Sequence, residues 1–193
     1  MKNDIYPHMQ AAAAEASRIA RGVDPTLPMT TPTHCPEWDL GALLNHWILY
    51  SSHGLEHRAL RKQLPEDLTK RDFAAEPGWA GAYAAQLDRA VAAWADPAAW
   101  EGEVDTGFAK MDASVIAALV VKELAVHGWD VARVTGQELR LPEATGEFIL
   151  GVVAEHAEIY RQYDGFAEPV PVADDAPALE RALALSGRDP RGR

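Results

Sequence analysis

Apolar residues recur every three or four positions along several long stretches of this chain, and this helical period constrains the fold more than any other feature of the sequence. Alanine is abundant in these stretches, while glycine and proline fall mostly between them, which favours helices over strands. The pattern predicts helices over residues 5–21, 39–63, 78–95, 112–134 and 145–163. Residues 101–108 fit a short strand or a loop equally well.

The length and composition of the chain bound its domain organisation. A chain of 193 residues, of which 48% are hydrophobic, is large enough for one packed core. Helices joined by short and medium connections are typical of an antiparallel bundle. The sequence therefore predicts an all-α protein, an antiparallel four-helix bundle that spans residues 1–193 as a single domain. Residues 165–193 are expected to be an irregular tail packed on it, with a short helix over 177–185.

Charge and cysteine content exclude several classes of partner. A formal net charge of −11 repels phosphate backbones, so a nucleic-acid partner is not expected. The longest apolar run, residues 113–121, is far short of the roughly 20 residues that cross a bilayer, so no membrane partner is expected. The single cysteine, Cys35, allows no internal disulfide, and the N-terminus has no apolar signal segment, which indicates a cytoplasmic protein. A homodimer is compatible with an acidic, alanine-rich bundle.

Two polar residues interrupt the apolar stripe of the segment 112–134. At about 100° per residue, one narrow face carries six residues: Ile116, Val120, Glu123, His127, Val131 and Val134. A carboxylate on such a face needs a positive partner, and we expect Lys122 to lie about 100° away round the helix. Glu123 and His127, four residues apart, are suited to hold a metal ion such as zinc. A hydrogen-bonded Glu–His pair without a metal is the alternative.

A third ligand has to come from another helix, and the segment 39–63 offers several polar side chains. Asp39 is expected to be the N-cap of this helix. Its main apolar stripe is Leu40, Leu44, Trp47, Ile48, Ser51 and Leu55, and the face beside that stripe carries Leu43, His46, Tyr50, His53 and His57. The spacing does not choose among the three histidines, and each alone is compatible with a surface position. Tyr50, His53 and His57 are candidate proton carriers, and hence candidate catalytic residues, beside a metal. Cys35 is interpreted as a buried small residue.

Several motifs together resemble the DinB-like metal-binding bundle superfamily, and most closely the metal-binding domain of mycothiol-dependent maleylpyruvate isomerase. The motifs are Cys35-Pro36-Glu37-Trp38-Asp39, Leu43-Leu44-Asn45-His46 and Glu123-Leu124-Ala125-Val126-His127-Gly128-Trp129-Asp130. The resemblance implies a metal bound between the second helix and a later one, with His46, Glu123 and His127 as its ligands. It also implies a C-terminal domain of the isomerase that this chain is too short to contain.

The resemblance also implies a chemistry. Three protein ligands leave one position open, as in catalytic zinc sites. The expected function is a metal-dependent transferase or isomerase in which a thiol, mycothiol in the related family, is added to a small electrophile. Zinc is the expected ion, and nickel is an alternative because affinity order favours it and an affinity tag can load it. The alternative function is a non-catalytic protein that binds a metal or a small ligand. Asp130 is expected to support the site and Trp129 to pack.

Overall fold

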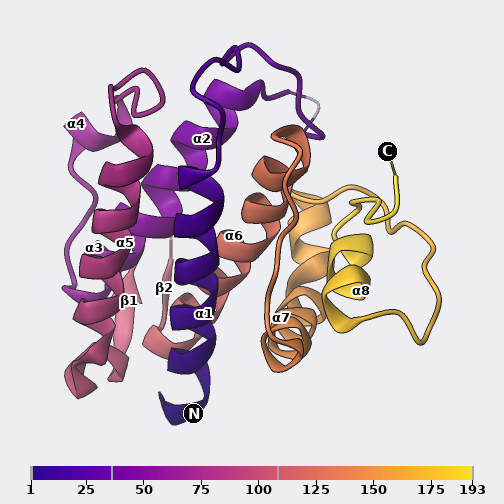
Figure 1. Ribbon diagram of the computed structural model, residues 1–193. Coiled ribbons are helices and arrows are strands. Elements are labelled where there is room, and N and C mark those ends of the chain that lie inside the picture. The colour runs from indigo at the N-terminus through magenta and orange to yellow at the C-terminus, as the bar shows by residue number, and fades with distance from the viewer. Residues whose placement is uncertain (1, 36, 108, 193) are drawn as a thin grey trace. The chain divides into compact units, whose positions relative to one another are not determined.

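The computed structural model describes residues 2–35, 37–107 and 109–192, so Pro36 of the first motif and Phe108 of the ambiguous segment lie outside the described residues. The chain is mostly helical, which confirms the expected all-α class (Figure 1). It divides into two compact units, residues 1–140 and 141–193, and each is described by itself. Within the described ranges, every helix is too short or too polar to traverse a lipid bilayer.

The first unit contains both segments that carry the predicted metal ligands. Its elements are α1 (Lys2–Arg21), α2 (Leu40–Ile48), the π-helix η1 (Leu49–His53), α3 (Gly54–Ala59), α4 (Glu66–Thr69), α5 (Trp79–Ala95), the 3₁₀ turn η2 (Pro97–Trp100), β1 (Glu103–Asp105), β2 (Lys110–Asp112) and α6 (Ala113–Val134). The ambiguous segment contains β1, which pairs with β2 in an antiparallel hairpin. The short helix α4 was not expected, because its four residues carry no periodic signal.

The core of this unit lies where the long helices meet. Helix α1 packs against α5 and α6, α2 packs against α6, and α3 packs against α5. The predicted apolar stripe of the second segment is buried in full: Leu40, Leu44, Trp47, Ile48, Ser51 and Leu55. The indole of Trp94 is also fully buried and donates to the Leu55 carbonyl at 2.9 Å, which ties α5 to α3.

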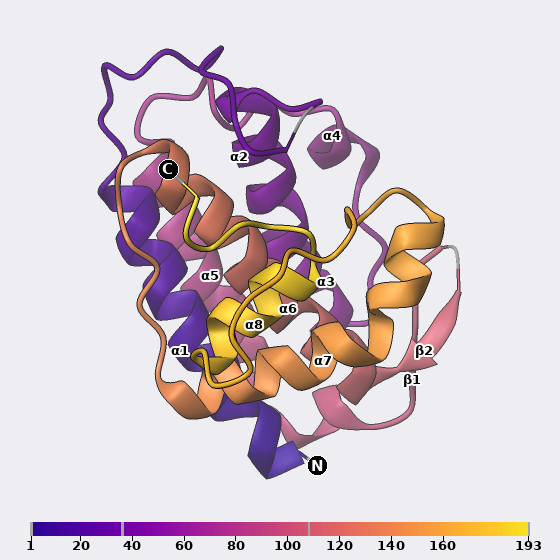
Figure 2. The same ribbon diagram turned by 90° about the vertical axis from the view of Figure 1, so that its right-hand side faces the viewer.

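The second unit is built on α7 (Glu143–Gln162) and α8 (Ala178–Leu185), which lie side by side (Figures 1 and 2). Gly146 permits their close approach, since a Cβ there would come within 3.1 Å of the Leu179 amide nitrogen. The Val170 amide donates to the Ala184 carbonyl at 2.9 Å, and Phe166 stacks on Tyr160. The short helix expected over 177–185 is therefore present, and it packs with the preceding segment on α7.

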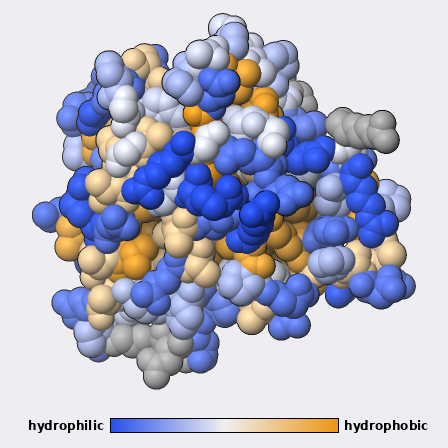
Figure 3. All heavy atoms as spheres, viewed as in Figure 1, coloured by the Kyte–Doolittle hydropathy of each residue, from blue (hydrophilic) through white to orange (hydrophobic). Residues whose placement is uncertain are grey.

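Polar side chains cover most of the face shown in Figure 3, with apolar residues in small patches. Among the described residues, the large apolar side chains classed as exposed are Tyr50, Leu60, Ile159 and Tyr163. Scattered single residues of this kind are normal for a protein surface. The expected homodimer stays a prediction.

The helical segment 40–59 is not a regular α-helix, because two serines compete for its backbone acceptors. The Ser51 hydroxyl donates to the Trp47 carbonyl at 2.5 Å, and the Ser52 hydroxyl donates to the Ile48 carbonyl at 2.7 Å. Hydroxyls that bond to the carbonyl four residues back distort helices. Here the Gly54 amide bonds to the Leu49 carbonyl five residues back, which is the π pattern. The extra residue in this turn rotates every later residue of the segment about 100° round the helix axis.

The start of α2 is fixed by its N-cap and by the loop before it. The Asp39 carboxylate accepts a hydrogen bond from the Ala42 amide at 2.9 Å, as the sequence predicted for this residue. The Leu40 and Gly41 amides bond to the carbonyls of Thr31 and Met29 at 2.9 and 2.8 Å. These bonds hold Trp38, the residue before the cap, against the first turns of α2.

Replacing Asp39 by alanine is expected to lower the free energy of unfolding by about 1 kcal/mol, because one amide of the first turn loses its acceptor. Asp39→Asn is expected to stay within a few tenths of a kcal/mol of the wild type, since asparagine caps as well as aspartate. Urea denaturation measures both, with Glu37→Ala at an exposed position as the control. Equal destabilisation by alanine and asparagine would contradict the cap.

Candidate metal centre

Helices α2 and α6 bring His46, Glu123 and His127 together, although 77 residues separate the first two. The Glu123 Oε2 atom lies 3.4 Å from His46 Nε2 and 3.3 Å from His127 Nε2. One donor atom from each of the three residues lies within 4.8 Å of the other two. The set that the resemblance implied is thus a spatial cluster in the structure.

These separations fit ligands that share an ion. Zinc bonds to nitrogen and oxygen of about 2.0–2.2 Å in a tetrahedron place neighbouring ligand atoms about 3.3–3.6 Å apart. Charge-assisted hydrogen bonds between nitrogen and a carboxylate are shorter, about 2.7–2.9 Å. Both Glu123–imidazole contacts fall in the first range, whereas the contact from His127 to Asp130, at 2.9 Å, falls in the second. The residues present therefore fit a divalent metal.

Asp130 orients the His127 ring from behind. Its carboxylate Oδ2 accepts from His127 Nδ1 at 2.9 Å, and the side chain is fully buried. When the ring is neutral, a proton on Nδ1 would leave Nε2, the atom nearest Glu123, as the nitrogen that can bind a metal. The Cys35 thiol donates to the same Asp130 oxygen at 3.5 Å, so the cysteine belongs to this network. Asp130 thus supports the site, as the sequence suggested.

Aromatic rings frame the two histidines. The Trp38 ring lies 4.5 Å from the His46 ring and 5.7 Å from the His127 ring, between centroids. The Tyr50 ring also contacts His46, with 4.7 Å between the two ring centroids. The side chains of His46, Glu123 and His127 keep 26%, 19% and 14% of their surface exposed, so the cluster reaches the surface of the unit.

Lys122 is rotated about 100° from Glu123 round α6, as expected, but its side chain nevertheless reaches the Glu123 carboxylate, which the sequence analysis did not predict. Its ammonium forms an ion pair with Glu123 Oε1, and its side chain is buried. The reason is that α6 packs against neighbours on several sides, so the face that carries Lys122 is also covered. A long lysine side chain spans the 100° rotation easily. One Glu123 oxygen therefore faces Lys122 and the other faces the imidazoles.

The charges in this cluster shift two pKa values. Burial alone would raise the pKa of Glu123, but the Lys122 charge and hydrogen bonds from His127 and His46 outweigh it and hold that pKa well below the usual value. Burial would likewise lower the pKa of His127, but hydrogen bonds to Asp130, Cys35 and Glu123 raise it to about 10. Glu123 is therefore a carboxylate in the folded protein, as a metal ligand has to be. His127, with its raised pKa, is an imidazolium at neutral pH without a metal, so a metal ion would have to displace the proton on its Nε2.

The three candidate proton carriers do not share one environment. The ring of Tyr50 lies against that of His46, a predicted ligand. The His53 ring instead stacks on Phe73, 5.2 Å between centroids, and lines a separate pocket. His57 bonds through Nδ1 to the His53 carbonyl at 2.8 Å. The π turn η1 explains the change of face, because Tyr50 lies near its start, His53 at its end and His57 after it, and the turn rotates the later residues of the segment. The roles of all three as proton carriers stay predictions.

No protein-family model, curated protein or solved structure matches this chain. The DinB-like resemblance therefore stays a prediction carried by the motifs and the cluster that they form. Sequence reasoning missed two residues of the site, Lys122 and Trp38. The sequence did carry a signal for Trp38. Trp38 precedes the N-cap residue Asp39, and the helix that Asp39 caps carries His46, so Trp38 lies near the His46 ring.

Replacing Asp130 by asparagine is expected to weaken metal binding about 10- to 100-fold, because His127 loses the charged acceptor that fixes its ring. Competition with a chromophoric zinc chelator measures the affinity. Asp88→Asn, at an exposed position of α5, is the matched control and should bind as the wild type does. Equal affinities of the Asp130 variant and the wild type would remove Asp130 from the site.

The lowered pKa of His53 predicts that the stability of the protein depends on pH. Burial, followed by repulsion from His57 and Arg71, lowers the pKa of His53 to about 4 from 6.5. Between these two pH values the unfolded chain binds a proton that the folded chain does not. The free energy of unfolding should therefore fall as the pH falls from about 6.5 to about 4, with this group adding at most about 1.4 kcal/mol per pH unit.

Urea denaturation over this pH range checks the slope. The slope is expected to be smaller in His53→Asn, and His156→Asn, on α7, controls for the loss of a histidine. Identical slopes in the wild type and the His53 variant would show that the ring takes up its proton as easily in the folded state as in the unfolded one.

Proposed function

We propose that this protein binds one divalent metal ion, zinc as the preferred ion, on His46, Glu123 and His127, and uses it to join a small thiol to a small electrophile. The observation that carries the proposal is the placement of Glu123 Oε2 at 3.3–3.4 Å from both imidazole Nε2 atoms, with Asp130 behind His127. The proposal includes the DinB-like, antiparallel four-helix arrangement and a thiol cofactor of the mycothiol type, both supported by the sequence motifs.

The ligand set leaves room for chemistry. Three protein ligands are typical of catalytic zinc sites, whereas structural sites use four. When bound, the metal would act as a Lewis acid that favours the thiolate form of a thiol. Glu123 supplies one negative charge, and its pairing with Lys122 keeps one oxygen directed to the imidazoles. His127 is held in a single ring orientation by Asp130.

A thiol next to a group that can carry a proton is suited to addition reactions. In an addition, the thiol sulfur forms a bond to an electrophilic carbon, and the proton that the thiol gave up goes to the neighbouring carbon. Tyr50 is our candidate to carry that proton, supported by its ring contact with His46 and its 37% exposed surface. Addition alone gives a thiol transferase. Addition, rotation about the former double bond and elimination of the same thiol give a cis–trans isomerase.

Metal quantification on tag-free protein tests the first half of the proposal. The wild type is expected to hold about one equivalent of zinc, and His46→Ala, Glu123→Ala and His127→Ala are each expected to hold less than about a tenth of that. His156→Ala, which changes a histidine of α7, is the control and should keep the full equivalent. An affinity tag is left out because it can load nickel.

Unchanged metal content in all three ligand variants, or no metal in the wild type, would contradict the site. The protein would then be a helical protein with a buried Glu–His–Lys cluster, which the Lys122–Glu123 ion pair makes stable without a metal.

Cobalt substitution tests the second half. Mycothiol, bacillithiol and glutathione are titrated separately into the cobalt protein, and a thiol that enters the site should add a sulfur-to-cobalt charge-transfer band. The same thiols are then assayed for turnover with small unsaturated and halogenated electrophiles. Metal binding without a thiol band or turnover would favour the alternative function, a non-catalytic metal-binding protein.

A further inference from the structure

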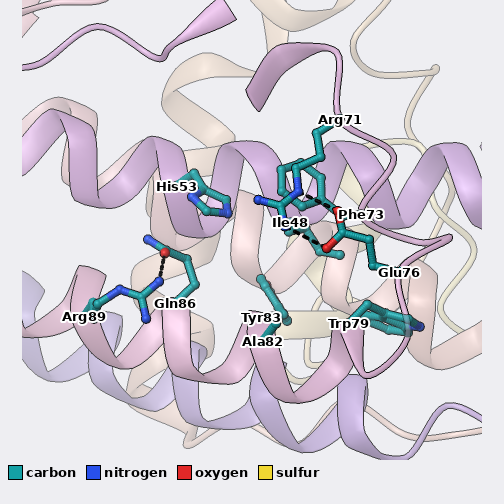
Figure 4. Close-up of a pocket in the computed structure, with 10 residues that line it drawn as sticks. All are labelled: Ile48, His53, Arg71, Phe73, Glu76, Trp79, Ala82, Tyr83, Gln86 and Arg89. Atoms are coloured by element: carbon teal, nitrogen blue, oxygen red, sulfur yellow. Dashed lines mark hydrogen bonds and ion pairs between the residues drawn. The ribbon is translucent and has the colours of Figure 1, made fainter. Parts of the chain in front are cut away.

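A pocket of about 140 Å³ lies in the first unit and is lined by none of the predicted metal ligands (Figure 4). Its walls come from the segment spanning the end of α2 and η1, from α5, and from the loop before α5. The residues that line the pocket are distinct from those that form the metal centre. The ligand that this pocket binds can therefore be inferred from its own lining residues.

The inner wall of this pocket is apolar. Ile48, Phe73 and Tyr83 line it and are almost fully buried, with 2%, 5% and 1% of their surfaces exposed. The half-buried indole of Trp79 adds a further flat surface. Apolar cavities of about 150 Å³ in proteins hold one benzene molecule. The size and lining of the pocket thus suit a flat apolar body of about one ring.

Two arginines give the pocket a positive rim. Arg71 and Arg89 line it from the loop and from α5 (Figure 4). Arg71 donates from Nε and Nη2 to the Glu76 carboxylate at 2.5 and 2.7 Å. The Arg71 guanidinium is therefore already oriented to bind a carboxylate with two parallel hydrogen bonds. That ion pair is largely solvent-exposed and hence weak. Arg89 bonds through its Nη atoms to Gln86 and the Ala85 carbonyl, and a guanidinium carries five N–H donors in all.

His53 adds a neutral donor to the positive rim. Its ring stacks on Phe73, and the Arg71 guanidinium lies 5.1 Å from the centre of the same Phe73 ring. Burial is the largest cause that lowers the pKa of His53 to about 4, followed by repulsion from His57 and Arg71, with a smaller contribution from Arg89 and with Glu56 acting in the opposite sense. At neutral pH the ring therefore offers one N–H, and Arg71 and Arg89 against Glu76 leave the lining residues with one net positive charge, which favours an anion.

The pocket is held open by specific bonds. Asn45 donates to the Asp72 carboxylate at 2.9 Å and accepts from the Ala74 amide at 2.9 Å, which clamps both sides of Phe73. The π turn η1 places His53 at the pocket, and π turns within helices occur frequently at functional sites. Tyr83 is fixed by a 2.8 Å hydrogen bond to Ser51 of the same turn. These contacts give the pocket a preformed shape.

We infer that this pocket binds a small monocarboxylate with a flat, ring-sized apolar body. The body packs on Phe73, Tyr83 and Trp79, and the carboxylate accepts from the arginines of the rim and from His53. A carboxylate is favoured over a larger anion because the fork of Arg71 already matches one and the cavity has room for a single ring. The inference does not depend on the metal centre.

Benzoate is the probe, with benzamide as its neutral analogue of the same shape and acetate as the anion without a ring. Isothermal titration of the full-length protein, as purified and after chelator treatment, measures the affinities. Benzoate is expected to bind at least about tenfold more tightly than either analogue, in the presence and absence of metal. Benzoate binding that is lost with the metal would instead place the anion on the metal centre and overturn the inference.

Variants separate charge from shape. Arg71→Gln and Arg89→Gln are each expected to weaken benzoate binding about tenfold, while Arg140→Gln, a highly exposed arginine elsewhere on the unit, should not change it. Ala82→Leu places bulk in the pocket without altering charge and should abolish binding, whereas Ala92→Leu, at an exposed position of the same helix, should not. Circular dichroism confirms that each variant is folded.

Three further results would overturn the inference: benzamide that binds as tightly as benzoate, arginine variants that bind as the wild type does, or an Ala82→Leu variant with unchanged affinity. Each is independent of metal content. Failure of this test is therefore distinguishable from failure of the metal centre, which is judged by zinc quantification alone.

Discussion

The charge of Glu123 is the constraint on which the rest of the first unit depends. A carboxylate in the half-buried interior of a helical protein is costly unless positive groups or hydrogen-bond donors surround it. Here Lys122 approaches one oxygen, and the imidazoles of His46 and His127 approach the other. The packing of α2 on α6 is what brings the His46 ring to that oxygen. The buried Asp130 carboxylate in turn accepts a hydrogen bond from His127 Nδ1, which fixes the orientation of the His127 ring.

The candidate metal centre and the pocket that we propose for a carboxylate share one helical segment, and the π turn divides them. His46 and Tyr50 lie at the metal side, and His53 lies at the pocket. The hydroxyls of Ser51 and Ser52 distort the backbone between them, and the Ser51 hydroxyl also fixes Tyr83. A regular helix would keep these histidines on one face. One local distortion therefore gives a single segment two chemically different surfaces.

Much of the fold follows from the period of the apolar residues, because burial of one face is a property that local spacing records. The stripe from Leu40 to Leu55 is buried as predicted, and the cap at Asp39 is present. The pairing of Lys122 with Glu123 was not predictable, since α6 is covered on more than one face and its own sequence does not reveal its neighbours. The change of face at His53 was missed because nothing in the apolar spacing marks the π turn: the stripe from Leu40 to Leu55 continues through it at intervals of three and four.

The sequence by itself determined the helices, the neighbouring positions of Glu123 and His127 on one face, and, through its motifs, the choice of His46. These are effects of spacing within a few turns, which the backbone geometry fixes. Only the tertiary structure decided that His46 meets Glu123 across 77 residues, that Lys122 balances the same carboxylate, and that two arginines and a neutral histidine converge on an aromatic pocket. Those contacts depend on how separate helices and loops pack, which no local pattern encodes.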